Sequence, residues 1–223
     1  MKGDVAIGYV HPVEVAASFH HSLTGLLLRD TKTSHRVGAL LPRNSSANIS
    51  NARNWIVREF LAGSCEWLWM VDADMSFDPD TLDRLLVNAS PAKAPIVGGL
   101  CFGVHDNVLF PTLYDLTRDE DGKVCTVRYD TFPDHAMFQV AATGAACLLI
   151  HREVLEKIGA RGGPYPWFQE TDLNGEPCGE DVTFCLRAGQ AGYPIWVDTG
   201  VEVGHQKTYV LTHEMYRAQR GHA

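Results

Sequence analysis

Long apolar runs are missing from this sequence. No stretch of its 223 residues approaches the ~20 consecutive apolar residues that a membrane helix needs, so no membrane span is expected. The first ten residues carry an early acid and no long apolar core, and they are predicted to form a strand rather than a signal peptide. Internal repeats, low-complexity tracts and obvious linkers are missing too, so the length fits one large domain or two small ones.

Paired cysteine motifs and an excess of basic residues are also missing. The six cysteines are scattered without a C-x-x-C spacing, and several lie in apolar runs, where a thiol behaves as a small hydrophobe. A reduced, cytoplasmic setting is therefore predicted. Asp and Glu number 27 against 19 Lys and Arg, which gives a net charge of −8 and argues against a nucleic-acid partner. A phosphorylated ligand would need a metal ion and local arginines to hold it against this charge.

The most informative feature that is present is an apolar run ending in two carboxylates. Residues 67–71 read WLWMV, as expected of a buried strand, and Asp72 and Asp74 follow directly. Ligands of open α/β sheets bind beyond the carboxyl ends of strands, and hard oxygen ligands suit Mg²⁺ or Mn²⁺. The simpler interpretation is that the two acids only open a turn. The helix signal that follows, with Asp78 as N-cap and Pro79 at the first helical position, favours a strand–loop–helix unit with a ligand site at its tip.

The remaining elements alternate in type. Strands are predicted at about 4–10, 36–41, 66–71, 95–102 and 194–203, and helices at about 13–28, 50–62, 79–88, 151–158 and 180–191. Turn signals within 105–142 predict short antiparallel strands there. The fold class is thus α/β, with a single domain, a mostly parallel mixed central sheet and a small antiparallel segment.

A second group of candidate residues lies between 178 and 205. Glu180 and Asp181 open a predicted helix, where acids also have the purely structural role of favouring the helix dipole. Gly192 and Pro194 end that helix, and a strand leads on to His205. A lone histidine after a strand is more often a packing or surface residue than a ligand.

In this order, the segments resemble the GT-A glycosyltransferases, and most closely glycosyltransferase family 2. The corresponding motifs are a D-x-D, here Asp72-Ala73-Asp74, a G-[AG]-x-x-[LI]-[LI] strand within ATGAACLLIHREVLEKIG, and an E-D-x-x-[LF]-x-x-R helix within GEDVTFCLRAGQAGYPI. The resemblance covers about residues 4–206, which are taken as the domain, with 207–223 as a polar tail or helix. The compact size is similar to short bacterial and bacteriophage members.

The resemblance implies a chemistry and roles for these residues. Family members use a nucleotide-diphosphate sugar, here with UDP favoured, and an acceptor glycan, protein or other hydroxyl compound. Asp72 matches an acid near the ribose that also contributes to the metal end of the site, and Asp74 matches the ligand of Mn²⁺ (or Mg²⁺). His205 matches a position that completes the metal shell in some members. Asp181 matches the general base of inverting members, with Glu180 as its neighbour and rival.

Further nucleotide contacts are implied at positions where packing is the alternative. Arg53 and Asn54 match a pair near the nucleotide, although Arg53 fits a solvated helix face equally well. Arg43 follows a predicted strand and could reach phosphate. Tyr9 lies at the end of the first strand, where the family places the nucleobase, and could stack there or simply pack. The Gly98-Gly99 pair completes the expected cofactor-binding set.

The sequence departs from the family pattern in two places, and two alternative functions remain open. The second strand ends in LPRN without the acid that reads the base in many members, and no Q-x-x-R-W acceptor motif follows the E-D helix. The Gly- and Pro-rich segment 160–179 is predicted to be a loop over the site, with Trp167 and Phe168 either stacking on a sugar or anchoring the loop. A sugar-phosphate nucleotidyltransferase and a catalytically silent nucleotide- or carbohydrate-binding module are the alternative functions.

Overall fold

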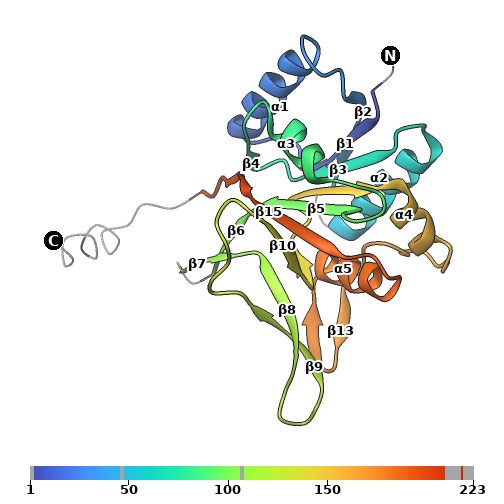
Figure 1. Ribbon diagram of the computed structural model, residues 1–223, viewed down its shortest axis with the longest axis vertical. Coiled ribbons are helices and arrows are strands. Elements are labelled where there is room, and N and C mark those ends of the chain that lie inside the picture. Colours follow the sequence, from blue (N-terminus) through green and yellow to red (C-terminus); the bar gives the residue numbers. More distant parts are fainter. Residues whose placement is uncertain (1–2, 46–47, 106–107, 209–216, 218–223) are drawn as a thin grey trace.

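A seven-stranded mixed sheet forms the centre of the computed structural model, which describes residues 3–45, 48–105, 108–208 and 217 (Figure 1). Its strands, in spatial order, are β10 (Met137–Val140), β15 (Ile195–Glu202), β5 (Ile96–Leu100), β12 (Cys147–His151), β3 (Trp67–Val71), β1 (Val5–His11) and β2 (Val37–Asn44). The pairs β1–β2, β1–β3 and β5–β15 are parallel, while β12 and β10 run antiparallel to their neighbours. The predicted mostly parallel α/β sheet is confirmed.

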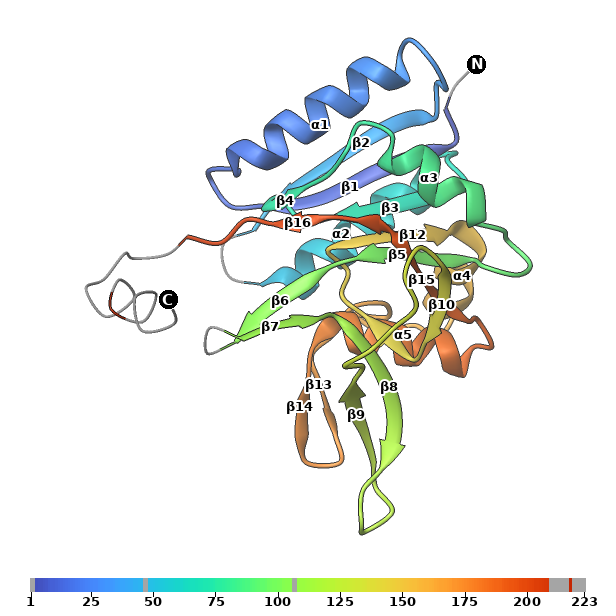
Figure 2. The same ribbon diagram turned by 60° about the vertical axis from the view of Figure 1, so that its left-hand side comes forward.

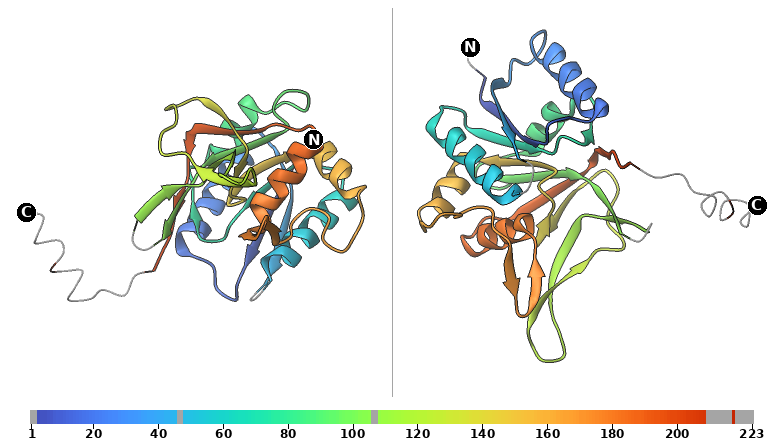
Figure 3. Two further views of the ribbon diagram at one scale, coloured as in Figure 1. Left: turned by 90° about the horizontal axis from the view of Figure 1, so that it is seen from below. Right: turned by 180° about the vertical axis from the view of Figure 1, so that it is seen from behind.

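Helices cover both faces of this sheet (Figure 3). They are α1 (Ala17–Asp30), α2 (Ile49–Ala62), α3 (Thr81–Asn88), α4 (Arg152–Gly159) and α5 (Glu180–Gln190). Side chains of β3 alternate between two apolar layers: Leu68 and Met70 pack with α2, α4 and α5, whereas Trp69 packs with α1 and α3. All five residues of β3 are buried, as expected for a central strand covered on both sides.

Two helices begin later than the sequence indicates. The helix predicted from residue 13 begins at Ala17, because the Ala16 N–H donates to the Ala73 carbonyl (3.2 Å) and ties this segment to the loop after β3. The helix predicted from Pro79 begins at Thr81, because residues 78–81 first close a turn through the Thr81 N–H and the Asp78 carbonyl (3.1 Å). Asp80 rather than Asp78 is therefore the N-cap.

The rest of the chain forms short antiparallel pairs, which confirms the segment predicted within 105–142. These strands are β6 (Phe102–His105) with β7 (Val108–Pro111), β8 (Leu113–Arg118) with β9 (Val124–Arg128) and β11 (Ala142–Thr143), β13 (Thr171–Leu173) with β14 (Glu176–Cys178), and β4 (Met75–Ser76) with β16 (Gly204–His205). Segment 160–179 is thus not loop throughout, because β13 and β14 form a hairpin inside it. The β8–β9 and β13–β14 hairpins project side by side from the body (Figure 2).

Beyond β16 little of the chain is described. Of the tail or helix predicted at 207–223, only 207, 208 and 217 belong to the described residues. Within the described ranges, none of the helices combines the length and apolar character needed to cross a bilayer. All six cysteines are free thiols, and five of them are buried.

Candidate functional site

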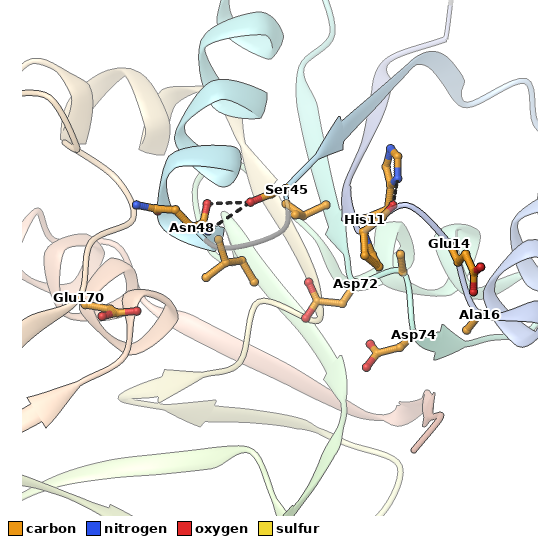
Figure 4. A pocket seen from close by; sticks show the side chains of 12 residues that line it. His11, Glu14, Ala16, Ser45, Asn48, Asp72, Asp74 and Glu170 are labelled. Atoms are coloured by element: carbon orange, nitrogen blue, oxygen red, sulfur yellow. Dashed lines mark hydrogen bonds between the residues drawn. The ribbon is translucent and has the colours of Figure 1, made fainter. Parts of the chain in front are cut away.

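A pocket of about 450 Å³ lies where β1, β2 and β3 end. Its polar lining comes from seven residues: His11 of β1, Glu14 before α1, Ser45 after β2, Asn48 before α2, Asp72 and Asp74 after β3, and Glu170 from the segment before β13 (Figure 4). Both aspartates point into the space that faces Glu170 in this view. The D-x-D motif therefore lies at the carboxyl edge of the sheet, where ligands of such folds bind.

Asp74 is bound by two side chains from the end of the described chain. Its Oδ2 lies 3.0 Å from His205 Nε2 and 3.2 Å from Lys207 Nζ. The His205 Nδ1 lies 2.9 Å from the Phe102 carbonyl, so the proton on Nδ1 is donated to that oxygen and Nε2 faces Asp74. This hydrogen bond to Asp74 raises the pKa of His205. Burial alone would raise the pKa of Asp74, but His205 and Lys207 together lower it.

The pairing of β4 with β16 brings His205 to this position. His205 lies opposite Met75 in the register, and the Gln206 N–H donates to the Asp74 carbonyl (2.8 Å). Gly204 permits the close approach, since a Cβ there would lie 2.4 Å from the Ser76 hydroxyl oxygen. Asp74 and His205, separated by 131 residues in the chain, are thus joined by backbone pairing as well as by their side chains.

Arg53 joins the D-x-D motif to the start of α5. Its Nη2 donates to Asp72 Oδ1 (2.7 Å), and its Nη1 donates to Glu180 Oε1. Arg53 is only 3% exposed, so the solvated-face alternative is wrong. Burial would lower the pKa of this guanidinium, but the charges of Asp72, Glu180 and Asp181 outweigh it and raise the pKa.

Glu180 and Asp181 have different surroundings although they are adjacent. Burial raises the pKa of Glu180, and its ion pair with Arg53 only partly offsets this. Asp181 Oδ1 accepts the N–H of Val182 (2.7 Å). Its other oxygen, Oδ2, lies 3.6 Å from the place that a Cβ on Gly144 would take, next to Thr112. Glu180 is therefore engaged by Arg53, whereas Asp181 keeps one oxygen beside a glycine.

Asn54, Trp167 and Phe168 hold the segment before β13 to the body. The Asn54 side-chain amide donates to the Phe168 carbonyl (2.6 Å), and its oxygen accepts the Trp167 N–H (3.3 Å). Trp167 donates its indole N–H to the Leu155 carbonyl (2.7 Å), and Phe168 stacks on Phe184. The anchoring alternative thus holds for both aromatic residues, which are buried. The structure does not bring Asn54 to the pocket surface.

Arg53 and four further predicted nucleotide contacts also lie outside the lining of this pocket. Tyr9 packs on Phe19, with a ring-centroid distance of 5.1 Å, and burial raises its pKa. Arg43 stacks over the Trp55 ring at 4.5 Å. Gly98 and Gly99 are buried in β5, where a Cβ on Gly99 would lie 3.0 Å from Cys147 Sγ. The sequence did not single out Ser45, Asn48, Glu170 or Lys207, which reach the pocket or Asp74 only through the tertiary fold.

Two solved structures share this fold. The chain matches A197 from STIV with a TM-score of 0.56 and 16% identity, over 91% of this chain and 86% of that protein. It matches GalNAc-T7, solved with UDP, GalNAc and Mn²⁺, with a TM-score of 0.58 and 12% identity, over 90% of this chain and 43% of that one. At these identities the likeness establishes the fold, which is GT-A.

The sequence itself points to one family. No curated protein sequence matches the chain. A family model described as glycosyltransferase like family 2 matches residues 39–221, which include the D-x-D motif, the Glu180-Asp181 helix start and His205. Since this match spans well over half of the chain, the protein belongs to glycosyltransferase-like family 2 and is a glycosyltransferase.

Proposed function

We propose that the protein transfers a sugar from a nucleoside-diphosphate sugar, with UDP as the favoured nucleotide, to an acceptor hydroxyl. The observation that carries this proposal is the pairing of Asp74 with His205 at the carboxyl edge of the sheet, beside a pocket of about 450 Å³. Pockets of this size accommodate small ligands and cofactors. In Figure 4 the Asp72 and Asp74 side chains both point into the space that faces Glu170, and the proposal places the diphosphate in that space.

The donor set fits a divalent cation that arrives with its substrate. Among the described residues, no three His, Cys, Asp or Glu side chains are close enough to form a metal site by themselves. The Asp74 carboxylate and His205 Nε2 would supply two ligands, and a substrate-borne Mg²⁺ or Mn²⁺ takes its others from phosphate and water. An imidazole ligand favours Mn²⁺ over Mg²⁺. When bound, the ion supplies Lewis-acid stabilisation of the leaving diphosphate.

Arg53 and Lys207 complete the donor side. Arg53 fixes Asp72 by a hydrogen bond and keeps that carboxylate at the pocket wall. Lys207 forms an ion pair with Asp74 (3.2 Å). Its flexible ammonium can turn from Asp74 to a phosphate oxygen once a cation occupies the carboxylate, because a lysine acts as a mobile point charge.

Asp181 is proposed as the general base of an inverting transfer. Glu180 is held by Arg53, whereas Asp181 Oδ2 faces Gly144 and Thr112. Asp181 would take the proton of the acceptor hydroxyl. At the same time the acceptor oxygen would bond to the anomeric carbon of the donor, and the bond between that carbon and the nucleotide diphosphate would break. Glu180 is the rival base, since burial raises its pKa and a raised pKa suits proton transfer near neutral pH.

Calorimetric titration with UDP, with and without Mn²⁺, tests the donor site. We expect Mn²⁺-dependent UDP binding to the wild type and its loss in Asp74→Ala. Asp78→Ala is the matched control, because Asp78 is an exposed acid four residues further on whose side chain lies outside the pocket. Full UDP affinity in the presence of excess chelator would show that the metal assignment is wrong. UDP binding without turnover of any UDP-sugar would favour a silent binding module.

A further inference from the structure

A second, smaller pocket lies between the two projecting hairpins. It measures about 320 Å³ and shares no lining residue with the donor pocket. Tyr114 and Thr126 line it from the β8–β9 hairpin, Glu176 and Pro177 from β14, and Gly179 and Val182 from the start of α5. Figures 1 and 2 show the hairpins side by side below the sheet, with α5 at their base. We call this space the hairpin pocket.

Asp181 connects the hairpin pocket to the donor side. It lies between Gly179 and Val182, which both line the pocket. Asp181 itself lines neither pocket, but its Oδ1 accepts the N–H of Val182 (2.7 Å) and lies 3.0 Å from the place that a Cβ on Gly179 would take. Its Oδ2 turns the other way, toward Gly144 and Thr112. The carboxylate therefore lies at the edge of the hairpin pocket with one oxygen directed away from it, as required of a base that receives a proton from an acceptor and faces a donor.

Hydrogen bonds between segments hold the walls of the hairpin pocket in place. Asn174 at the tip of the β13–β14 hairpin donates its amide to the Val124 carbonyl of β9 (2.8 Å). Thr171 of β13 and Thr183 of α5 join their hydroxyl groups (2.8 Å). The two hairpins and the helix thus form one assembled site.

The lining selects a chemical class of ligand. The rings of Tyr114 and Pro177 offer apolar faces of the kind that pack against the C–H face of a pyranose, while Thr126 and Glu176 offer hydrogen-bonding groups. Glu176 is the charged side chain of the lining, so an anionic ligand would meet like charge there, while Arg128 is engaged by a hydrogen bond with the Tyr114 side chain. The volume lies at the small end of ligand pockets and suits one sugar residue.

We propose that the hairpin pocket binds the terminal sugar of a neutral carbohydrate acceptor and presents one of its hydroxyl groups to Asp181. This proposal rests on the proposed glycosyltransfer. The acceptor oxygen forms the new bond to the anomeric carbon of the donor, and its proton passes to the Asp181 carboxylate. The bond between the anomeric carbon and the diphosphate breaks, and UDP leaves with the bonding electrons.

A larger cavity of about 790 Å³ lies nearby but does not serve this purpose. Its lining includes Leu186, Gly189 and Tyr193, from the later turns of α5 and beyond. A ligand there would contact the helix away from its first turn, where Asp181 lies. Gln139, an exposed residue of β10 that lines this cavity, provides a distant control position.

Filling the hairpin pocket from an exposed position tests the proposal without disturbing the core. Thr126 is exposed on β9 and lines the pocket, so Thr126→Trp should occupy the acceptor space. Val127→Trp is the matched control, because Val127 is the next residue of the same strand, is 47% exposed and does not line the pocket. Gln139→Ala controls for effects of the larger cavity.

Transfer is measured from a panel of UDP-hexoses with Mn²⁺ to neutral p-nitrophenyl hexosides, with p-nitrophenyl glucuronide as the anionic counterpart of the glucoside. Glycoside binding is measured in parallel by saturation-transfer NMR. We expect a neutral hexoside to bind and accept sugar, with the glucuronide poorer. Thr126→Trp should lower kcat/KM for the acceptor at least about tenfold, while UDP affinity stays within about threefold. Val127→Trp and Gln139→Ala should match the wild type.

Three results would overturn the assignment of the hairpin pocket. The first is equal sugar transfer by Thr126→Trp and Val127→Trp. The second is a preference of the wild type for the glucuronide over the glucoside as acceptor. The third is a wild type that hydrolyses a UDP-sugar but binds none of the neutral hexosides. A wild type that binds no UDP with Mn²⁺ would instead show that the proposed glycosyltransfer from UDP-sugars is wrong. The two failures are therefore distinguishable.

Discussion

The two sides of Asp181 are built in different ways. On the donor side, charged groups are bonded to one another and are wholly or partly buried. Arg53 is 3% exposed and bridges Asp72 and Glu180, and His205 bonds Asp74, next to the pairing of β4 with β16. On the hairpin side, most residues of β8 and β9 are exposed, and Asn174 bridges to the next hairpin through a backbone carbonyl.

This difference fits the demands of the proposed donor and acceptor. Mutually bonded charges cannot move independently, so they suit the proposed donor, whose diphosphate would be the same in every reaction. Exposed hairpins with few buried contacts change sequence and shape at little cost in stability, so they suit recognition of a particular acceptor. We therefore expect substitutions on the donor side to reduce stability and chemistry together, and substitutions on the hairpin side to change acceptor use alone.

Removal of Arg53 should have the largest effect on stability. Arg53→Ala leaves Asp72 and Glu180 without their buried partner, and breaking a buried charge pair typically costs about 3–5 kcal/mol. Urea unfolding of this variant should show a lower midpoint with the slope unchanged. Arg36→Ala removes a solvent-exposed ion pair with Asp4 and should cost no more than about 1 kcal/mol. Equal losses in the two variants would mean that the Arg53 cluster does not stabilise the fold.

Removal of His205 should come next in size. His205→Ala deletes one proposed metal ligand and should weaken Mn²⁺ binding by roughly 10- to 100-fold, judged from the effect of losing even an outer-shell partner. Titration of Mn²⁺ in the presence of UDP measures this, and circular dichroism checks that the fold is intact. His151→Ala is the control. His151 caps α4 and packs on Trp67 at the start of β3, whereas the pocket lies at the other end of that strand. Unchanged Mn²⁺ affinity in His205→Ala would exclude the ligand role.

A smaller difference in stability is expected between substitutions of two asparagines whose side chains each hydrogen-bond a distant backbone segment. Asn54 is fully buried and bonds the segment before β13, so Asn54→Ala should cost about 1–3 kcal/mol. Asn174 bridges the exposed hairpins at φ +59°, and Asn174→Gly, which keeps that backbone conformation accessible, should change stability by no more than about 1 kcal/mol. Unfolding midpoints in urea compare the two. A larger loss for Asn174→Gly would contradict the contrast between the two sides.

Local signals predicted the parts of the fold and site that depend on short stretches of chain. The WLWMV run followed by Asp72 and Asp74 was enough to place a buried strand with acids at its carboxyl end. Local signals did not predict that β12 lies between β3 and β5 and runs antiparallel to both, because strand pairing depends on contacts between residues that are distant in the sequence. Arg53 illustrates the same limit, since its partner Glu180 lies 127 residues away and turns an apparent surface arginine into a buried one.

The steady-state kinetics of Asp181→Asn, with its UDP affinity, test most directly the claim that Asp181 joins a donor site to an acceptor site. The asparagine keeps the shape of the side chain but cannot accept the acceptor proton. Because a general base acts only in the transition state, kcat should fall by roughly 10²- to 10⁴-fold while the Kd for UDP with Mn²⁺ stays within a few-fold. Glu180→Gln should mainly raise the acceptor KM. Turnover near wild type in Asp181→Asn, together with its loss in Glu180→Gln, would contradict the account and assign the base to Glu180.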